Sequence, residues 1–290
     1  MTPNVIERLD LSRYPATAPA RTLELLFIHH SCGGQLLADP GPEEGSNCIY
    51  RTHPNGGGLR AKLERNSYRV HEVSYSSALG ERTDIFDWLP KFRGRMDMIL
   101  AADGPDRSYP DNSRNQIVVF KSCFPNNRFV AEGNAPGNPA GPELTVRNAQ
   151  AAYEPLLEEF RKHSNVLFVC VTAPPLAPKG NGGWKSAMKR LLGREVTLES
   201  SARLARQFNN WLSSRDGWLK SYPLNNVVVF DYYDVLTGCG ESDCSLYPTG
   251  DGSDSHPSRA GNEKAAEVFV PFLNRAVHRL GVAQQPGAPS

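Results

Sequence analysis

A serine and a distant histidine carry the clearest chemical signal in this chain. Ser31 stands in "LLFIHHSCGGQLL", residues 25–37, where an apolar run ends in a turn that two glycines permit. A serine hydroxyl becomes a nucleophile only when a base accepts its proton. His256 precedes a proline near the end of the chain, and Asp251 and Asp254 stand just before it. A histidine in a rigid turn beside a carboxylate has the parts of an oriented general base.

Two loop residues carry groups that can stabilise a developing oxyanion. Asn126, in "SCFPNN", can donate its side-chain amide, and Gly80, in "SALGER", can bring a backbone N–H close to the same point. Asparagine and glycine are common in turns, so either residue alone indicates no more than a loop. Their occurrence in order, after successive strands, is what indicates a shared site.

Five apolar runs predict the strands that would position these residues. In each run the apolar residues are consecutive, which is typical of strands buried on both faces of a parallel sheet. Parallel strands bind ligands at their carboxyl ends, and Ser31, Gly80 and Asn126 each follow such an end. The runs are residues 23–29, 68–75, 116–123, 165–173 and 226–236.

Helical patterns alternate with these runs. Apolar residues at helical spacing predict long helices at 146–160, 198–212 and 259–280, with a kink at Pro155 in the first. Shorter helices are predicted after residues 55–58 and over 84–92. Strands that alternate with helices form a parallel sheet covered on both faces, so the predicted fold class is α/β, a three-layer sandwich with a five-stranded parallel sheet.

Charge and hydropathy limit the partners that we expect. The chain has 32 Lys and Arg against 31 Asp and Glu, a formal charge of +1, which favours neither nucleic acid nor an anionic membrane. Its longest apolar runs are far shorter than the roughly 20 residues of a spanning helix. We therefore expect a small neutral or weakly charged substrate, and no nucleic acid or membrane as partner.

We predict a single domain over residues 21–281, with an N-terminal arm of low order at 1–20 and a disordered tail at 282–290. Six cysteines are present, and their spacing matches no zinc motif. Two disulfides are compatible with the loops, Cys239 with Cys244 and Cys32 with Cys48. Because sequence alone cannot pair them, a secreted or periplasmic location and a cytoplasmic one remain equally open.

The order of these residues resembles the SGNH hydrolases, also called GDSL esterases and lipases. A serine follows the first strand, a glycine the second and an asparagine the third, and a histidine precedes the last helix. The block "SHPSRAGNEKAAEVF" is the most specific part, and "VTAPPL" and "FNNWL" are also similar. The resemblance implies a flavodoxin-like α/β/α fold and ester hydrolysis without a metal or other cofactor.

Carried over by position, the resemblance makes Ser31 the nucleophile and His256 the base, with the Ser31 N–H, the Gly80 N–H and the Asn126 amide as the oxyanion hole. The family usually has an aspartate three residues before the histidine, where this chain has Ser253. We therefore choose Asp254 as the carboxylate, with Asp251 as the alternative and a Ser-His dyad also open.

The first block departs from the family pattern, because His29 and His30 replace the usual Gly-Asp before the serine. We keep His30 as a possible site residue, and Asn127 as a substitute for Asn126 if the loop register differs by one. A metal-dependent hydrolase using His29, His30, His256 and Asp231 is an alternative, although adjacent residues of a strand point to opposite faces.

Two other readings compete with a serine esterase. Cys32 is a chemically plausible nucleophile beside a histidine. A protein with this fold that binds carbohydrate without catalysis is also possible, with exposed aromatic side chains as stacking surfaces. The candidate aromatic residues are Trp88, Trp184, Tyr232 and Tyr233.

Overall fold

The computed structural model describes residues 6–179 and 196–281. Its centre is a five-stranded sheet with the order β10-β9-β8-β1-β5, and every pair of neighbouring strands is parallel. The strand order is that of flavodoxin-like folds. The predicted fold class is thereby confirmed. The strands are β1 (Leu23–Ile28), β5 (Tyr68–Val73), β8 (Ile117–Lys121), β9 (Leu167–Val171) and β10 (Val227–Phe230).

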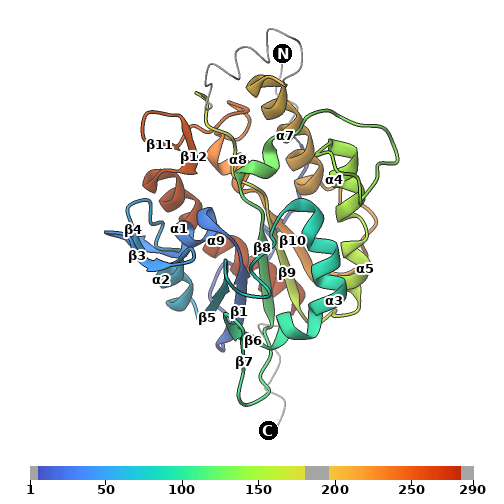
Figure 1. The fold of residues 1–290 in the computed structure, drawn as a ribbon. Coiled ribbons are helices and arrows are strands. Elements are labelled where there is room, and N and C mark those ends of the chain that lie inside the picture. The colour runs from blue at the N-terminus through green and yellow to red at the C-terminus, as the bar shows by residue number, and fades with distance from the viewer. Residues whose placement is uncertain (1–5, 180–195, 282–290) are drawn as a thin grey trace.

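Helices cover both faces of the sheet (Figure 1). In β1, Leu26 and Ile28 pack into one hydrophobic cluster, whereas Leu25 and Phe27 pack into the cluster on the other face. This explains why the strands are apolar at consecutive positions. The first cluster is covered by α3 (Trp88–Ala101), α4 (Val146–Tyr153), α5 (Leu156–Arg161) and α7 (Leu198–Ser213), and the second by α1 (Ser31–Leu37), α2 (Leu59–Glu64) and α9 (Arg259–Leu280).

Two predicted elements are divided in the structure. Pro155 separates α4 from α5, as its missing N–H and fixed φ lead one to expect. The run 226–236, predicted as one strand, ends at Phe230 and continues as helix α8 (Tyr232–Leu236). The side chain of Asp231 accepts a hydrogen bond from the Asp234 N–H at 3.0 Å, so this aspartate caps the helix and ends the strand.

Short strands and 3₁₀ helices lie between the larger elements. The hairpin formed by β11 (Pro248–Thr249) and β12 (Asp254–Pro257) leads into α9. The 3₁₀ helices η1 (Ile85–Asp87) and η2 (Phe124–Asn127) follow β5 and β8. The remaining short strands are β2 (Asp39–Pro40), β3 (Glu44–Ser46), β4 (Ile49–His53), β6 (Ala102–Gly104) and β7 (Arg107–Ser108).

The described part of the N-terminal arm is packed against the domain, which corrects the prediction of low order for residues 6–20. Arg8 pairs with Asp231 and Asp234, and its backbone bridges to Ser214. The Arg275 guanidinium donates to backbone carbonyls of the segment, at 2.7 Å for the one of Ser12. The predicted tail at 282–290 lies outside the described residues.

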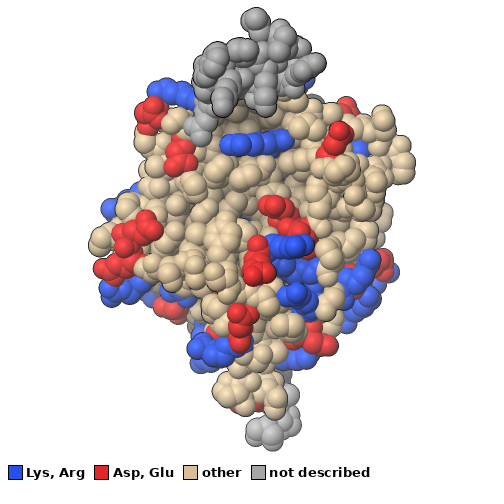
Figure 2. Space-filling model, in the orientation of Figure 1, with Lys and Arg blue, Asp and Glu red and all other residues tan. Residues whose placement is uncertain are grey.

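On the face that Figure 2 shows, acidic and basic side chains lie next to one another. This mixture agrees with the near-zero net charge of the sequence. Within the described ranges, no helix is both long enough and apolar enough to cross a membrane.

Candidate active site

The side chains of Ser31, His256 and Asp254 form a continuous chain of hydrogen bonds. His256 Nε2 lies 3.0 Å from Ser31 Oγ, and His256 Nδ1 lies 2.7 Å from Asp254 Oδ1. The fold therefore brings together residues that are 225 positions apart in the sequence. With a proton on Nδ1, held by the carboxylate, the lone pair of Nε2 faces the serine hydroxyl, as a general base requires.

Ser31 is presented by the first turn of α1, directly after β1. The carbonyl oxygen of His30 accepts from the N–H groups of Gly33 and Gly34 at 2.8 and 3.2 Å, which closes the turn. Side chains do not fit here: a Cβ on Gly34 would lie 1.9 Å from the Cys48 carbonyl oxygen. The glycines thus let helix α1 pack closely against its neighbours, whereas the sequence analysis assigned them to a turn.

His256 is held by the β11–β12 hairpin. Its carbonyl oxygen accepts from Thr249 Oγ1 at 2.8 Å, and its backbone N–H donates to Asp254 Oδ1 at 2.9 Å. The ring of Phe124 meets the imidazole edge-on with 4.9 Å between centroids. The histidine side chain is 26% exposed and the Asp254 side chain 47%, so solvent reaches the hydrogen bond between them.

The alternative carboxylate, Asp251, has other partners. Its Oδ1 accepts from the Ser253 hydroxyl at 2.7 Å and from the Ser253 N–H at 3.1 Å. These hydrogen bonds lower the pKa of Asp251. The aspartate therefore closes a local turn, and the contact with the His256 ring belongs to Asp254.

Gly80 does not offer its N–H to a ligand, which corrects the prediction for this residue. The amide donates to the carbonyl oxygen and to the hydroxyl of Ser77 at 3.0 and 3.1 Å. The glycine is required for a different reason, because a Cβ there would lie 1.9 Å from the Ser74 carbonyl oxygen. Gly80 therefore shapes the loop after β5.

Asn126 and Asn127 differ sharply in their surroundings. Asn127 donates to the carbonyl oxygens of Ala173 and Pro174 at 3.0 and 2.9 Å, so it anchors the loop after β9. Asn126 accepts from the Ile85 N–H and donates through Nδ2 to Asp84 Oδ1 at 2.7 Å. These bonds fix its amide in η2, the segment whose Phe124 touches His256.

The four residues of the metal alternative do not converge. His29 Nε2 lies 2.9 Å from Glu72, whereas His30 Nε2 lies 2.6 Å from the Gly80 carbonyl oxygen. The two rings point to opposite sides of the chain, as strand geometry predicts. Asp231 pairs with Arg8. Over residues 6–179 and 196–281, no group of three or more His, Cys, Asp and Glu side chains is arranged to hold a metal ion.

Neither of the two disulfides compatible with the sequence is formed, because all six cysteines are free thiols in the structure. Cys32 is fully buried, and its side chain bonds to Cys123. The Cys48 thiol accepts from the Tyr50 hydroxyl at 3.6 Å. Burial raises the pKa of Cys32 well above its usual range, which argues against Cys32 as a nucleophile.

The sequence reasoning missed a buried lysine and cysteine beside the candidate nucleophile. Cys123 Sγ lies 3.8 Å from Ser31 Oγ and 3.5 Å from the Nζ of Lys121, whose side chain is fully buried. The hydrogen bond from Cys32 and the nearby ammonium lower the pKa of Cys123 well below its usual range, although burial opposes them. The lysine inside the apolar run "IVVFKSC" could have indicated these contacts, because a buried charged group needs a polar partner.

We expect iodoacetamide to alkylate Cys123 before Cys32, because the hydrogen bond from Cys32 and the nearby Lys121 ammonium lower the pKa of the Cys123 thiol, whereas burial raises the pKa of Cys32. Peptide mass spectrometry after timed quenching measures both sites. Cys170 is the control, since burial in β9 raises its pKa and alkylation there should be slow. Labelling of Cys32 ahead of Cys123 would contradict this assignment.

Three of the four aromatic residues proposed as stacking surfaces are fully buried in the core: Trp88, Tyr232 and Tyr233. The prediction is wrong for them, and Trp184 lies outside the described residues. Tyr75 is the exposed aromatic residue near the site. It is 43% exposed and stacks on His30 with 3.7 Å between ring centroids.

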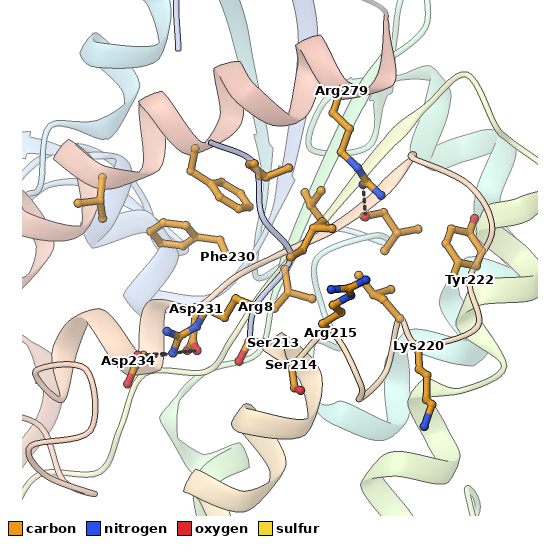
Figure 3. A pocket seen from close by; sticks show the side chains of 18 of the residues that line it. Arg8, Ser213, Ser214, Arg215, Lys220, Tyr222, Phe230, Asp231, Asp234 and Arg279 are labelled. Carbon is orange, nitrogen blue, oxygen red and sulfur yellow. Dashed lines mark hydrogen bonds and ion pairs between the residues drawn. The ribbon is translucent and has the colours of Figure 1, made fainter. Parts of the chain in front are cut away.

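A cavity of about 500 Å³ lies at the edge strand β10 (Figure 3). Apolar side chains of β10 and α9 line it, and Arg8 bridges Asp231 and Asp234 on one side. Its described lining contains neither Ser31 nor His256, so this cavity is separate from the candidate active site.

No family model and no curated protein matches this chain. Solved structures do. A carbohydrate esterase family 2 enzyme with a carbohydrate-binding domain, from Corynascus thermopiles (Myceliophthora fergusii), is 16% identical with a TM-score of 0.40, and the match covers 91% of this chain and 68% of that chain. A carbohydrate acetylesterase from Sinorhizobium meliloti is 13% identical with a TM-score of 0.44, covering 87% and 98%. An acetyl xylan esterase from Geobacillus stearothermophilus is 17% identical with a TM-score of 0.39, covering 94% and 100%.

The fold that the resemblance to the SGNH hydrolases implies, a flavodoxin-like α/β/α sandwich, is the fold observed. The sheet order is flavodoxin-like, and Ser31 and Asn126 follow the ends of neighbouring strands β1 and β8. At identities of 13–17%, the likeness concerns the fold alone. Any assignment of function must therefore come from the contacts of the site.

Proposed function

We propose that this protein is a serine esterase that hydrolyses small acyl esters, with Ser31 as nucleophile, His256 as general base and Asp254 as the carboxylate that orients the base. The observation that carries the proposal is the chain of contacts from Asp254 through His256 to Ser31, at 2.7 and 3.0 Å. Both distances lie in the range that proton transfer requires.

The first half of the reaction forms an acyl-enzyme. Ser31 Oγ attacks the ester carbonyl carbon while His256 Nε2 takes the hydroxyl proton, and Asp254 stabilises the imidazolium that results. The tetrahedral intermediate then expels the alcohol, which receives the proton from His256. In the second half, His256 takes a proton from water as the water oxygen attacks the acyl carbon. The bond from that carbon to Ser31 Oγ then breaks, His256 returns the proton to Ser31 Oγ, and the carboxylic acid leaves.

Two donors are available for the oxyanion. The Ser31 N–H is the first amide of α1, and the first amides of a helix have no acceptor within it. The Asn126 amide carries two protons, of which one bonds to Asp84. We assign the second to the oxyanion, together with the Ser31 N–H.

The substrate class that we propose is a small acyl group on a carbohydrate or another polar alcohol. The near-neutral charge and the polar, Gly- and Pro-rich loops of the sequence favour a polar substrate over a lipid. Tyr75 adds an exposed aromatic face beside His30, next to the nucleophile.

A fluorophosphonate probe tests the assignment of the nucleophile. Attack by Ser31 Oγ displaces fluoride and leaves a phosphonyl group on the peptide that contains residue 31, which mass spectrometry locates. We expect this labelling to abolish hydrolysis of p-nitrophenyl acetate in step with its extent. Full labelling at another serine, or unchanged hydrolysis after labelling of Ser31, would reject the proposal.

A series of p-nitrophenyl esters from acetate to octanoate, assayed beside acetylated xylo-oligosaccharides, tests the substrate class. We expect the acetate to be the fastest aryl ester, and acetate release from the sugars. Fastest turnover of the octanoate would contradict a small acyl group. Sugar binding without turnover of any ester would favour the non-catalytic alternative.

A further inference from the structure

His29, which replaces the glycine of the family pattern, makes two hydrogen bonds in a fully buried position. Its Nδ1 lies 3.0 Å from the His30 carbonyl oxygen, and its Nε2 lies 2.9 Å from Glu72 Oε2. Glu72 is itself buried and also accepts from the Arg60 guanidinium. His29, which follows β1, Glu72 of β5 and the half-buried Arg60 of α2 thus form one chain of contacts that ends at the backbone of His30.

Both partners of the His29 ring are acceptors. A carbonyl oxygen has no proton to give, and the Glu72 carboxylate already accepts from Arg60. A neutral imidazole has one N–H and satisfies only one such acceptor. The two contacts are satisfied together when both ring nitrogens carry a proton, so the geometry favours an imidazolium whose charge is balanced by Glu72.

The carbonyl oxygen that His29 contacts is the one that closes the first turn of α1. It also accepts from the N–H groups of Gly33 and Gly34, and no side chain caps this helix. The His29 ring fills the space beneath the turn, because a Cβ on Gly33 would lie 2.4 Å from the His29 Cβ. Ser31 lies within this turn.

We propose that His29 is a buried imidazolium and a positioning residue, which with Glu72 and Arg60 holds the His30 carbonyl and so the turn that presents Ser31. Hydrogen bonds from a charged donor are shorter and stronger than neutral ones. A small displacement of a reacting atom slows the reaction strongly, so contacts that hold the Ser31 turn in place increase the rate. The effect on catalysis rests on the proposed esterase function, whereas the protonation state does not.

The protonation state is measured by ¹H–¹⁵N NMR of the imidazole nitrogens at pH 7, with the His29 signals assigned by their loss in His29→Gln. We expect two protonated ring nitrogens, each with a slowly exchanging proton, in the wild type and equally in Ser31→Ala. A single protonated nitrogen at pH 7 would overturn the imidazolium. Because the NMR signals do not depend on catalysis, the test also holds if the protein hydrolyses no ester, and Ser31→Ala should give the same signals as the wild type.

The chain contains a matched control on the same two strands. His71 Nδ1 lies 3.0 Å from the Asp103 carbonyl oxygen, His71 Nε2 lies 2.8 Å from Glu24, and Arg69 pairs with Glu24. This arrangement of histidine, carboxylate, carbonyl and arginine repeats that of His29. Its carboxylate, Glu24, lies at the amino end of β1, whereas its histidine directly precedes Glu72 in β5, and neither ring nitrogen of His71 contacts the His30 carbonyl.

We expect Glu72→Gln and His29→Gln to lower kcat for p-nitrophenyl acetate about tenfold, with KM changed less than about twofold. Glu24→Gln and His71→Gln should leave kcat within about twofold at a comparable change in Tm. If the His29 and Glu72 variants lose no more kcat than the His71 and Glu24 variants at the same decrease in Tm, the role of His29 is merely structural and the proposal is overturned. Glu72→Gln covers the case in which His29→Gln fails to fold.

Discussion

Ser31→Ala and His256→Ala are each expected to lower kcat for p-nitrophenyl acetate by about three orders of magnitude or more. The first variant lacks the attacking oxygen, and the second lacks the base 3.0 Å from it. The double variant should be no slower than either single one, because the two groups act as a unit. Steady-state kinetics with freshly purified protein measures all three.

Matched controls separate loss of chemistry from loss of structure. Ser108 on β7 and His163 after α5 offer a serine and a histidine that make no contact with this chain of hydrogen bonds. Ser108→Ala and His163→Ala should keep near-wild-type kcat, and all four single variants should melt within a few degrees of the wild type. Near-wild-type turnover by Ser31→Ala or His256→Ala would reject the assigned roles.

Asp254→Asn is expected to lower kcat about 10- to 100-fold. An asparagine at this position no longer stabilises the imidazolium and can favour the wrong tautomer of His256. The loss should be smaller than for a buried triad carboxylate, since the Asp254 side chain is 47% exposed and water screens its charge.

Asp251→Asn is the matched control, since this aspartate bonds only to Ser253 among the described contacts. Its kcat should stay within about twofold of the wild type. If Asp254→Asn is as active as Asp251→Asn, the site works as a Ser-His dyad. If Asp251→Asn is the slower of the two, the carboxylate has been assigned to the wrong residue.

The sequence alone predicted the fold class and the strand ends at which the candidate site residues lie. Consecutive apolar residues mark strands buried on both faces, and the helix 259–280 was predicted at the bounds that the structure has. Ser31 and His256 were singled out by residue type and by position after a strand and before a helix. These features are local, because periodicity, turn chemistry and capping are properties of short segments.

The end of β10 shows where a local pattern misleads. The apolar run past Phe230 favours a strand, but the Asp231 side chain caps a helix at the Asp234 N–H. One hydrogen bond across three residues therefore outweighs the propensity of the run. Gly80 illustrates the same limit, because its place after a strand allows the close packing against Ser74, whereas its N–H is bonded to Ser77.

What the sequence could not decide is which distant side chains meet. Asp254 and Asp251 are both aspartates that closely precede His256. Only the β11–β12 hairpin brings the side chain of Asp254 to the His256 ring. The role of His29 depended on Glu72 and Arg60, which come from another strand and a helix. Contacts between segments far apart are set by the packing of the whole sheet and its helices, so the tertiary structure alone joined Ser31 to its partners.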